Sequence, residues 1–352
     1  MSHRSTRWAR FARRALAVAL VALIVPLTAC SGATDATDPA TDGSATDEAW
    51  PDTIRIGYQI ILNGDLVVKN QQLLEQAFGP DVNIEWKLFD SGGNVNQAMA
   101  SGSLDIGLVG SSPVSRGLSS GIPYQVPWIH DVIGDAESLA VKPGIASLAD
   151  LKGKTVATPF SSTAHYSLLA ALADAGLDSA DVNLIDAEPP AILAAWQAGQ
   201  IDAAYVWNPV LGELLADQGT LLVSSAEMAA KGKTTYDLAV VSEAFATRYP
   251  AAVQLWVDQQ NIAVEQILAG DPKAYQSIAA EASITAEDAE EQMRGLIYVN
   301  AADQASDQYL GQGVADNIYA AAQFNLGLGQ ITSLLDRSAY DQAVVSAYAA
   351  AA

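Results

Sequence analysis

From Thr53 onward, short apolar runs alternate with segments of helical periodicity, and this alternation restricts the fold more than any other feature of the sequence. Such alternation predicts parallel α/β sheets covered by helices. The predicted strands are residues 53–59, 82–89, 104–109, 124–130, 137–141, 154–158, 182–186, 201–207 and 236–241. The predicted helices between them are residues 65–78, 94–101, 113–120, 163–175, 189–198 and 208–217.

After residue 242 the sequence predicts only helices, at 250–269, 271–282, 285–295 and 311–325. Two successive α/β units followed by a helical return predict two lobes. The first lobe would comprise residues 52–140 and 236–352, and the second residues 141–235. In open α/β sheets the ligand lies outside the carboxyl ends of the strands, so we expect a binding cleft between the lobes.

The first 29 residues have the composition of a secretory signal peptide. Residues 1–14 are basic, residues 15–27 are apolar, and small residues precede Cys30. An apolar run of this length is shorter than the ~20 residues that a membrane-spanning helix needs. The sequence therefore predicts export rather than a transmembrane anchor.

The tetrapeptide Leu27-Thr28-Ala29-Cys30 resembles a lipobox, the motif at which bacterial lipoproteins are acylated on cysteine and cleaved. Residues 30–51 then repeat Ala-Thr-Asp with almost no large apolar side chain, which predicts a flexible spacer. By this resemblance, Cys30 would carry a lipid that anchors the protein to the outer face of the cytoplasmic membrane.

Charge and composition argue against several classes of function. The chain has 40 acidic and 18 basic side chains, a formal net charge of −22, and such a surface repels nucleic-acid phosphates. It has one cysteine and three histidines, without the spacing of a metal site, and no disulfide can form within the chain. We therefore expect no metal, no cofactor and no nucleic-acid partner.

Three predicted strand-to-helix junctions are rich in small polar residues: 90–93, 110–113 and 159–163. Backbone N–H groups at a helix start, together with the helix dipole, can hold an anion without lysine or arginine. The alternative is ordinary N-capping by the hydroxyl groups. The candidate anion-binding residues at these junctions are Ser91, Ser111, Ser112, Ser161, Ser162 and Thr163.

Four further residues are candidates for the cleft. Asp237 opens an apolar strand, where it could receive an ammonium group or simply form a structural hydrogen bond. Trp207 ends a strand and could form an apolar wall, stack on a cation, or belong to the core. His165 could donate to an oxyanion or be satisfied by its neighbours, and Gln59 has both donor and acceptor capacity at the end of the first strand.

Several longer motifs resemble a known family. KLFDSG from Lys87, SGSLDIG from Ser101 and GSSP from Gly110 are similar to the nitrate/sulfonate/taurine-type solute-binding proteins of ABC importers. The taurine-binding branch of that family is resembled by PFSSTAHYSLLAAL from Pro159, PPAILAAWQ from Pro189 and IDAAYVW from Ile201.

The resemblance implies a type II periplasmic-binding-protein fold, with two mixed α/β lobes and a C-terminal helical return, that closes on its ligand by a hinge. It implies a monomer that captures taurine for an ABC permease and its ATPase subunits. The sulfonate would lie at the serine-rich helix starts, close to Ser111, Ser112, Ser161, Ser162, Thr163, His165 and Trp207. The amine would lie at Asp237.

Two positions depart from the taurine branch. Glu188 stands where glutamine is usual, and Asn208 stands where alanine is common. A Glu188 side chain in the cleft would repel a sulfonate or favour a more cationic solute. The alternatives are therefore a receptor for alkylsulfonates, nitrate or another small anion or zwitterion, or a biosynthetic enzyme of the same fold, for which His165 would be the one candidate base.

Overall fold

The computed structural model describes residues 50–352. The predicted signal peptide (1–29), Cys30 and the predicted spacer up to residue 49 lie outside the described residues. Trp50 packs edge-on against Phe78, with ring centroids 5.4 Å apart, so the end of the predicted spacer already contacts the folded part. Within residues 50–352, no helix is long and apolar enough to cross a bilayer.

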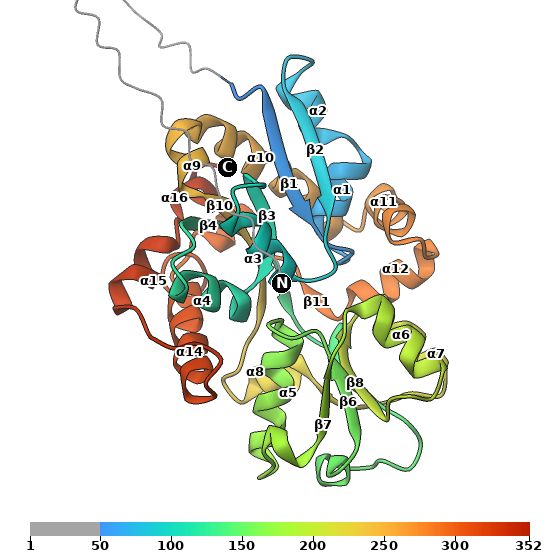
Figure 1. Cartoon of the computed structure of the whole chain (residues 1–352). Coiled ribbons are helices and arrows are strands. Elements are labelled where there is room, and N and C mark those ends of the chain that lie inside the picture. Colours follow the sequence, from blue (N-terminus) through green and yellow to red (C-terminus); the bar gives the residue numbers. More distant parts are fainter. Residues whose placement is uncertain (1–49) are drawn as a thin grey trace, which may run out of the picture. The chain divides into compact units, whose positions relative to one another are not determined.

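The first sheet has six strands in the order β11-β4-β10-β3-β1-β2 (Figure 1). Strand β1 pairs in parallel with β2 and β3, whereas β10 is antiparallel to both β3 and β4. The bounds of these strands are β1 Thr53–Tyr58, β2 Asn83–Leu88, β3 Ile106–Gly110, β4 Tyr124–Ile133, β10 Tyr236–Ser242 and β11 Leu296–Ile297.

The second sheet has five strands in the order β7-β6-β8-β5-β9. Strand β6 is parallel to β7 and β8, and β5 is antiparallel to β8 and β9. The bounds are β5 Glu137–Val141, β6 Thr155–Thr158, β7 Asn183–Asp186, β8 Ala203–Trp207 and β9 Thr220–Ser224. The two sheets share one feature: a strand, β10 in the first sheet and β5 in the second, is inserted antiparallel to both of its neighbours.

Helices cover both sheets. Their bounds are α1 Gly64–Asn70, α2 Leu73–Phe78, α3 Gly92–Ala100, α4 Ser111–Ser119, α5 Thr163–Asp174, α6 Pro189–Gln197, α7 Val210–Ala216, α8 Ser225–Ala230, α9 Glu243–Arg248, α10 Pro250–Leu268, α11 Pro272–Ala282, α12 Ala286–Met293, α13 Ala301–Gln304, α14 Gly313–Gly327, α15 Arg337–Ala343 and α16 Ala347–Ala351. Two 3₁₀ turns, Leu148–Leu151 and Ser179–Asp181, lie in the second lobe.

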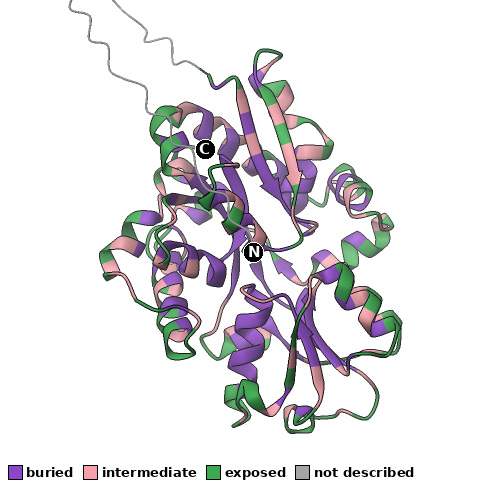
Figure 2. Ribbon diagram, viewed as in Figure 1, coloured by how far each residue is buried: buried purple, intermediate pink, exposed green. Residues whose placement is uncertain are grey.

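The two faces of the second sheet are covered by different helices, α5 with α8 and α6 with α7 (Figure 1). Alternate residues of β8 explain the two layers, because successive side chains of a strand point to opposite faces. Tyr205 belongs to the cluster under α5, and Val206 belongs to the cluster with Ile192 and Leu211 under α6 and α7. All of these side chains are buried, as Figure 2 shows for most residues of the two sheets.

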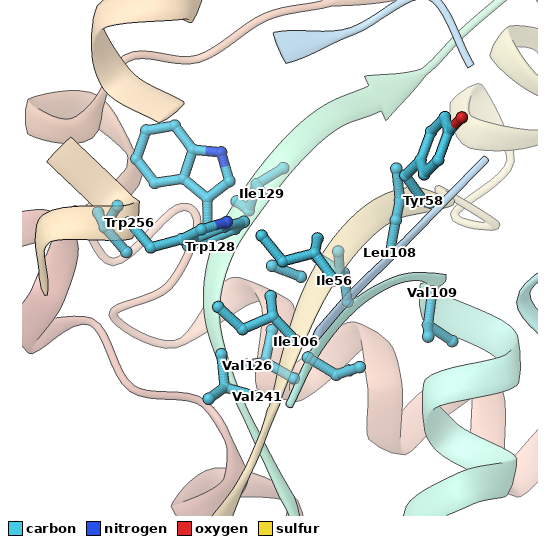
Figure 3. Close-up of a cluster of buried hydrophobic side chains, with 14 of the residues drawn as sticks. Ile56, Tyr58, Ile106, Leu108, Val109, Val126, Trp128, Ile129, Val241 and Trp256 are labelled. Carbon is cyan, nitrogen blue, oxygen red and sulfur yellow. The ribbon is translucent and has the colours of Figure 1, made fainter. Parts of the chain in front are cut away.

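The core of the first lobe is one continuous apolar cluster built around its sheet (Figure 3). Trp128 of β4 and Trp256 of α10 are completely buried there, beside the β-branched residues Ile56 and Ile106 of the parallel strands. Full burial of a large apolar side chain contributes roughly 1.5–3 kcal/mol to the stability of this lobe. Because α10 supplies such side chains, the helical return after residue 242 is part of the core.

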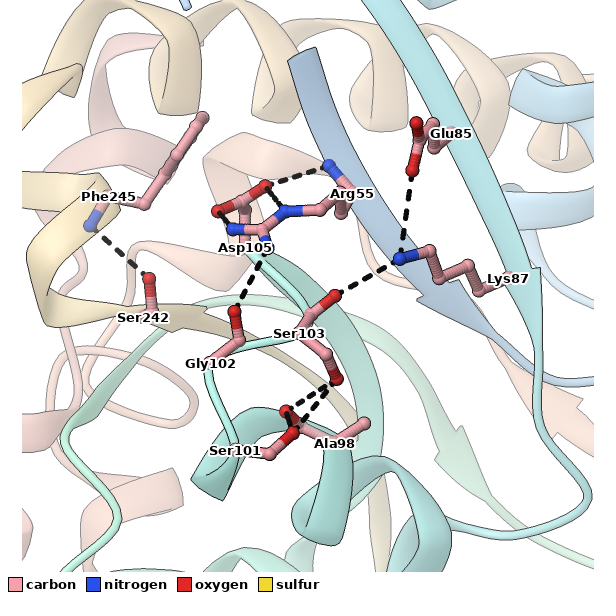
Figure 4. Close-up of polar contacts among 10 residues, drawn as sticks. All are labelled: Arg55, Glu85, Lys87, Ala98, Ser101, Gly102, Ser103, Asp105, Ser242 and Phe245. Atoms are coloured by element: carbon pink, nitrogen blue, oxygen red, sulfur yellow. Dashed lines mark hydrogen bonds and ion pairs between the residues drawn. The ribbon is translucent and has the colours of Figure 1, made fainter.

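A partly buried ion pair joins neighbouring strands of the first sheet (Figure 4). The Arg55 guanidinium donates to both carboxylate oxygens of Asp105, at 2.9 and 2.7 Å, in the bidentate geometry that makes such pairs strong. The backbone carbonyl of Asp105 accepts from the amide of Ser242, at 2.9 Å. These contacts tie β1 and the residue preceding β3 to the end of β10.

The chain crosses between the lobes through residues 134–136 and returns through residues 231–235. At the crossing, the amides of Gly134 and Ala136 both donate to the carbonyl of Gly295, at 3.0 and 3.1 Å. A Cβ on Gly134 would lie 2.7 Å from the Gly295 oxygen, and a Cβ on Gly295 would lie 2.4 Å from the Ala136 nitrogen. Both glycines are needed because the two backbones pass so close.

The structure differs from the predictions in several places. The sheets are mixed, as expected for two mixed α/β lobes, and not parallel throughout as the strand–helix alternation alone predicts, because β10 and β5 run against their neighbours. The strands do not cease after residue 242, since β11 pairs with β4. Strand β9 lies where no strand was predicted, and the predicted helix 65–78 breaks at Gln72, whose φ is 56°. Strand β5 belongs to the second sheet, so the predicted lobe boundary after residue 140 falls inside a strand.

Candidate ligand-binding cleft

A pocket lies between the lobes. Its walls come from the ends of β1, β3 and β8, the starts of α3 and α5, and the first crossing of the chain. Five residues predicted for the site line it: Gln59, Ser162, Thr163, Trp207 and Asp237. The remaining polar residues of its lining are Glu137 and Asn208, neither of which the sequence singled out for a binding role.

The three predicted junctions converge at this pocket. A Cβ placed on Gly92, the first residue of α3, would lie 3.3 Å from the amide nitrogen of Gly110, and a Cβ on Gly110 would lie 2.5 Å from Thr163 Cγ2. The starts of α3, α4 and α5 are therefore within contact distance of one another. N–H groups in a first helical turn have no partner inside the helix, so the junctions together can offer several donors to one anion.

Most serine and threonine hydroxyls at these junctions already have structural partners. Ser162 caps α5 by accepting from the amide of His165 at 3.0 Å, and Thr163 Oγ1 donates to Glu137 Oε2 at 2.5 Å. Ser111 Oγ accepts from the amide of Tyr236 at 3.2 Å, and Ser112 Oγ accepts from Asn325 Nδ2 at 3.3 Å. Ser111 and Ser112 do not line the pocket, so their hydroxyls serve β10 and α14.

Ser91 and Ser161 lie in a second, more polar pocket at the junction of the lobes, next to His165. The His165 ring stacks on Phe160 at 4.5 Å, and its Nδ1 accepts from the amide of Ser161 at 3.3 Å. Burial and the nearby Arg116 guanidinium lower the pKa of His165 to about 4. The ring is neutral at neutral pH, and because Nδ1 accepts, the proton lies on Nε2.

Three buried carboxyl groups lie in the lining of the pocket or directly behind it. Asp237, 6 % exposed, lies opposite the completely buried Asp131 in the β10–β4 register, so the two carboxyl groups are neighbours and act on each other's pKa. Burial raises the pKa of both, and the mutual repulsion of the two charges raises that of Asp237 further. The pair therefore holds a proton at neutral pH when no cation is present.

Glu137 is the third carboxyl group. It opens β5 directly after the crossing, is 1 % exposed, and accepts from Thr163 Oγ1 and from Ser225 Oγ at 2.7 Å. Burial raises its pKa to about 7, against the effect of these two hydrogen bonds. Its charge also raises the pKa of Asp131 and Asp237, so the three groups act on one another.

The prediction from sequence missed Asp131 and Glu137. The predicted strand 124–130 ended one residue before Asp131, within what is now β4. Glu137 opens an apolar strand in the same way as Asp237, so the argument that selected Asp237 applied to it equally. Within the described chain, no group of three or more acidic, histidine or cysteine side chains is arranged to hold a metal ion.

The ionisable side chains in the described lining of the pocket are all acidic. Among the described residues, Asp237 and Glu137 are the ionisable groups that line the pocket, and neither lysine nor arginine lines it. A buried carboxylate without a partner is costly, so the pocket favours a ligand that brings a positive group. An anionic group on the same ligand would be held by neutral donors at the helix starts.

The family of substrate binding domains of ABC-type glycine betaine transport systems matches residues 52–283. The chain belongs to this family. Its two mixed sheets have the periplasmic-binding-protein fold, as the resemblance predicted, and it is the substrate-binding component of an ABC import system.

Similar proteins bind sulfur-containing solutes. The chain is 35% identical over 271 residues to the taurine-binding periplasmic protein of Escherichia coli, covering 75% of this chain and 83% of that protein. It is 33% identical over 174 residues to a putative aliphatic sulfonates-binding protein of the same organism, covering 49% and 54% of the two chains.

Among solved structures, the alkanesulfonate-binding protein of Xanthomonas axonopodis pv. citri, bound to MOPS, superimposes with a TM-score of 0.70. The sequences are 25% identical, and the match covers 84% of this chain and 99% of that one. These relatives are solute-binding proteins, and the taurine-binding protein of Escherichia coli is periplasmic, which agrees with the predicted class and extracytoplasmic compartment.

Proposed function

We propose that this chain captures taurine or a closely related aminosulfonate and delivers it to an ABC permease. The observation that carries the proposal is a pocket lined by two buried carboxyl groups, Glu137 and Asp237, and by convergent helix starts, whose described lining has no cationic side chain. A third buried carboxyl group, Asp131, lies opposite Asp237 behind this lining. A zwitterion with a compact anionic end satisfies both sides. The identity of the E. coli taurine-binding relative supports the choice of a sulfonate.

Asp237 and Glu137 would receive the ammonium group. A primary ammonium offers three N–H donors, which suits two carboxylates that approach from different lobes. A quaternary ammonium has no N–H and is usually held inside an aromatic cage. In the described lining of the pocket, Trp207 is the one aromatic ring, so the pocket favours a primary amine over a betaine.

The sulfonate would rest on backbone amides at the starts of α3, α4 and α5. Neutral donors avoid the desolvation of a buried cation, and hydrogen bonds to a charged group contribute ~1.5–3 kcal/mol each. A few such bonds at both ends of the ligand are sufficient for micromolar binding, which requires about −8.2 kcal/mol. Gln59 would add a polar contact, since its side chain lines the pocket while its Nε2 donates to the carbonyl of Leu108 at 3.0 Å.

The other candidate functions lack a comparable observation. An alkylsulfonate or nitrate would leave the carboxyl groups without a positive partner. The base that the sequence offered for a catalytic role, His165, stacks on Phe160 and does not line the pocket. We therefore propose a binding protein without enzymatic activity, anchored through Cys30 to the outer face of the cytoplasmic membrane.

The test is a panel of ligands titrated calorimetrically into the chain without residues 1–29 and with Cys30→Ser. Taurine should bind at least tenfold more tightly than ethanesulfonate, which has no amine, and than glycine betaine, whose ammonium has no N–H. Nitrate should bind weakest. Equal affinities for taurine and ethanesulfonate would contradict the proposed role of the carboxyl groups.

A further inference from the structure

The Glu188 side chain leaves its own helix and reaches the other lobe. Glu188 is the N-cap residue of α6, with an extended backbone (φ −74°, ψ 157°), and its side chain makes no capping hydrogen bond. The next two residues, Pro189 and Pro190, have no N–H for a cap to satisfy, and a residue before proline is restricted to extended conformations. The sequence Glu-Pro-Pro thus leaves the Glu188 carboxylate without a hydrogen bond to the start of its own helix.

The carboxylate binds the start of α3 in the first lobe. Glu188 Oε1 accepts from Asn94 Nδ2 at 2.8 Å and from Ser91 Oγ at 3.0 Å, and Asn94 Nδ2 also approaches Ser91 Oγ at 3.3 Å. Ser91 is itself the N-cap of α3 and is 1 % exposed. An acidic group at a helix N-terminus is further stabilised by the helix dipole.

This contact lies immediately beside the ligand pocket but outside it. Gly92, the residue after Ser91, lines the ligand pocket, whereas Glu188 lines the neighbouring polar pocket together with Arg116 and Asp186. The possibility that Glu188 repels a bound sulfonate therefore does not apply to this structure. Its Oε1 accepts hydrogen bonds from Ser91 and Asn94 of the first lobe instead.

A second contact between the lobes is of a different kind. Phe324 of α14, in the first lobe, packs edge-on against Tyr166 of α5, with ring centroids 4.9 Å apart, and contacts the apolar cluster of the second sheet. The contact between Phe324 and Tyr166 is apolar, so the two rings can shift against each other without losing a directional bond. The Glu188 contact is directional, and it requires the start of α6 to lie against the start of α3.

We propose that Glu188 is a closure latch: a positioning residue that holds the lobes together over an occupied pocket and slows release of the ligand without touching it. The proposal rests on the proposed function only in requiring that a ligand occupies the cleft. Because the latch acts on the lobes, its loss should affect every ligand of the pocket by the same factor.

The first measurement is the rate of ligand release, followed by stopped-flow fluorescence of the tryptophans, which include Trp207 in the pocket. Glu188→Ala should accelerate release of taurine and of ethanesulfonate about tenfold each, and the ratio of their affinities should not change. Asn94→Ala should accelerate release less, and the double variant should be no faster than Glu188→Ala alone. Glu213→Ala removes the same charge from an exposed position of the same lobe and should have no effect.

Glu188→Gln is the conservative variant, because it keeps an acceptor oxygen. Burial raises the pKa of Glu188, and the Asp90 and Asp186 carboxylates raise it further, so a neutral amide should be accepted there. Release from this variant should stay within about twofold of the parent. A changed ratio between taurine and ethanesulfonate in Glu188→Ala would show a ligand contact instead, and an unchanged release rate would refute the latch.

The second measurement needs no ligand. Nitroxide labels at Asp81→Cys and Ala180→Cys, exposed positions of the first and second lobe, report the distance between the lobes. Glu188→Ala should shift the distribution towards longer distances, and Glu188→Gln should restore it. Identical distributions in all three proteins would overturn the latch. If no ligand of the panel binds, the proposed function fails, whereas the distance measurement still decides the latch.

Discussion

Replacing Asp237 by asparagine tests the recognition of the ammonium group most directly. The change keeps the size of the side chain and removes its charge at a position that is 6 % exposed. A hydrogen bond to a charged group contributes ~1.5–3 kcal/mol, and each 1.4 kcal/mol is a factor of ten in affinity. If Asp237 held the ammonium alone, taurine would bind roughly 10- to 150-fold more weakly.

Asp131 reduces the expected loss. Burial raises the pKa of Asp131 to about 7, and the Asp131 charge raises the pKa of Asp237, so in the variant a second carboxyl group remains beside position 237 that can ionise when a cation binds. Asp131 has one hydrogen bond from Asn63, at 3.1 Å, and keeps it in the variant. We therefore expect a loss near the lower end of the range, about 10- to 30-fold for taurine.

The assay is isothermal titration calorimetry with taurine and ethanesulfonate on both proteins. Ethanesulfonate has no amine, so its affinity for Asp237→Asn should be unchanged or improved. Asp81→Asn, which removes a carboxylate from an exposed turn of the first lobe, is the control and should bind both ligands like the parent. Equal losses for the two ligands, with an unchanged melting temperature, would refute the role of Asp237 in holding an amine.

Three further predictions concern stability. Folding raises the pKa of Glu137 from about 4.5 to about 7, so the free energy of unfolding of the ligand-free protein should fall by about 3 kcal/mol as the pH rises from about 4.5 to 7. Glu137→Gln should remove this pH dependence of the free energy of unfolding, measured by urea denaturation at several pH values. Trp256→Ala empties a completely buried site and should lower the free energy of unfolding by about 3–5 kcal/mol, measured by chemical denaturation. Gly134→Ala forces a Cβ to within 2.7 Å of the Gly295 oxygen and should cost about 1–3 kcal/mol in the same assay, whereas Gly327→Ala, at the exposed end of α14 where an added Cβ meets no neighbour, should cost less.

The elements that the sequence predicted best are those with strong local signals. The strand ending at Trp207 and the helix starting at Thr163 were recognisable from their periodicity and flanking residues alone, and the structure has both. The direction of β10 was not predictable in this way. Its antiparallel insertion between β3 and β4 depends on where the chain returns after the second lobe, which no local pattern records.

The site shows the same limit. The three polar junctions could be found from sequence because small polar residues after a strand are a local feature. Which hydroxyls face the ligand could not, since Ser111 and Ser112 are taken up by Tyr236 and Asn325, more than a hundred residues away in the chain. Asp131 was missed for a related reason, because its partner Asp237 is brought beside it only by the pairing of β4 with β10.

The double crossing of the chain has a consequence for how the protein is made. Strand β10 fills the gap between β3 and β4, and it is synthesised only after the whole second lobe. Until it emerges, β3 and β4 expose unpaired edges, whereas the second sheet is already complete at β9. The second lobe can therefore fold first. A chain truncated before residue 236 would lack β10 and leave the first sheet incomplete, with exposed strand edges that promote aggregation.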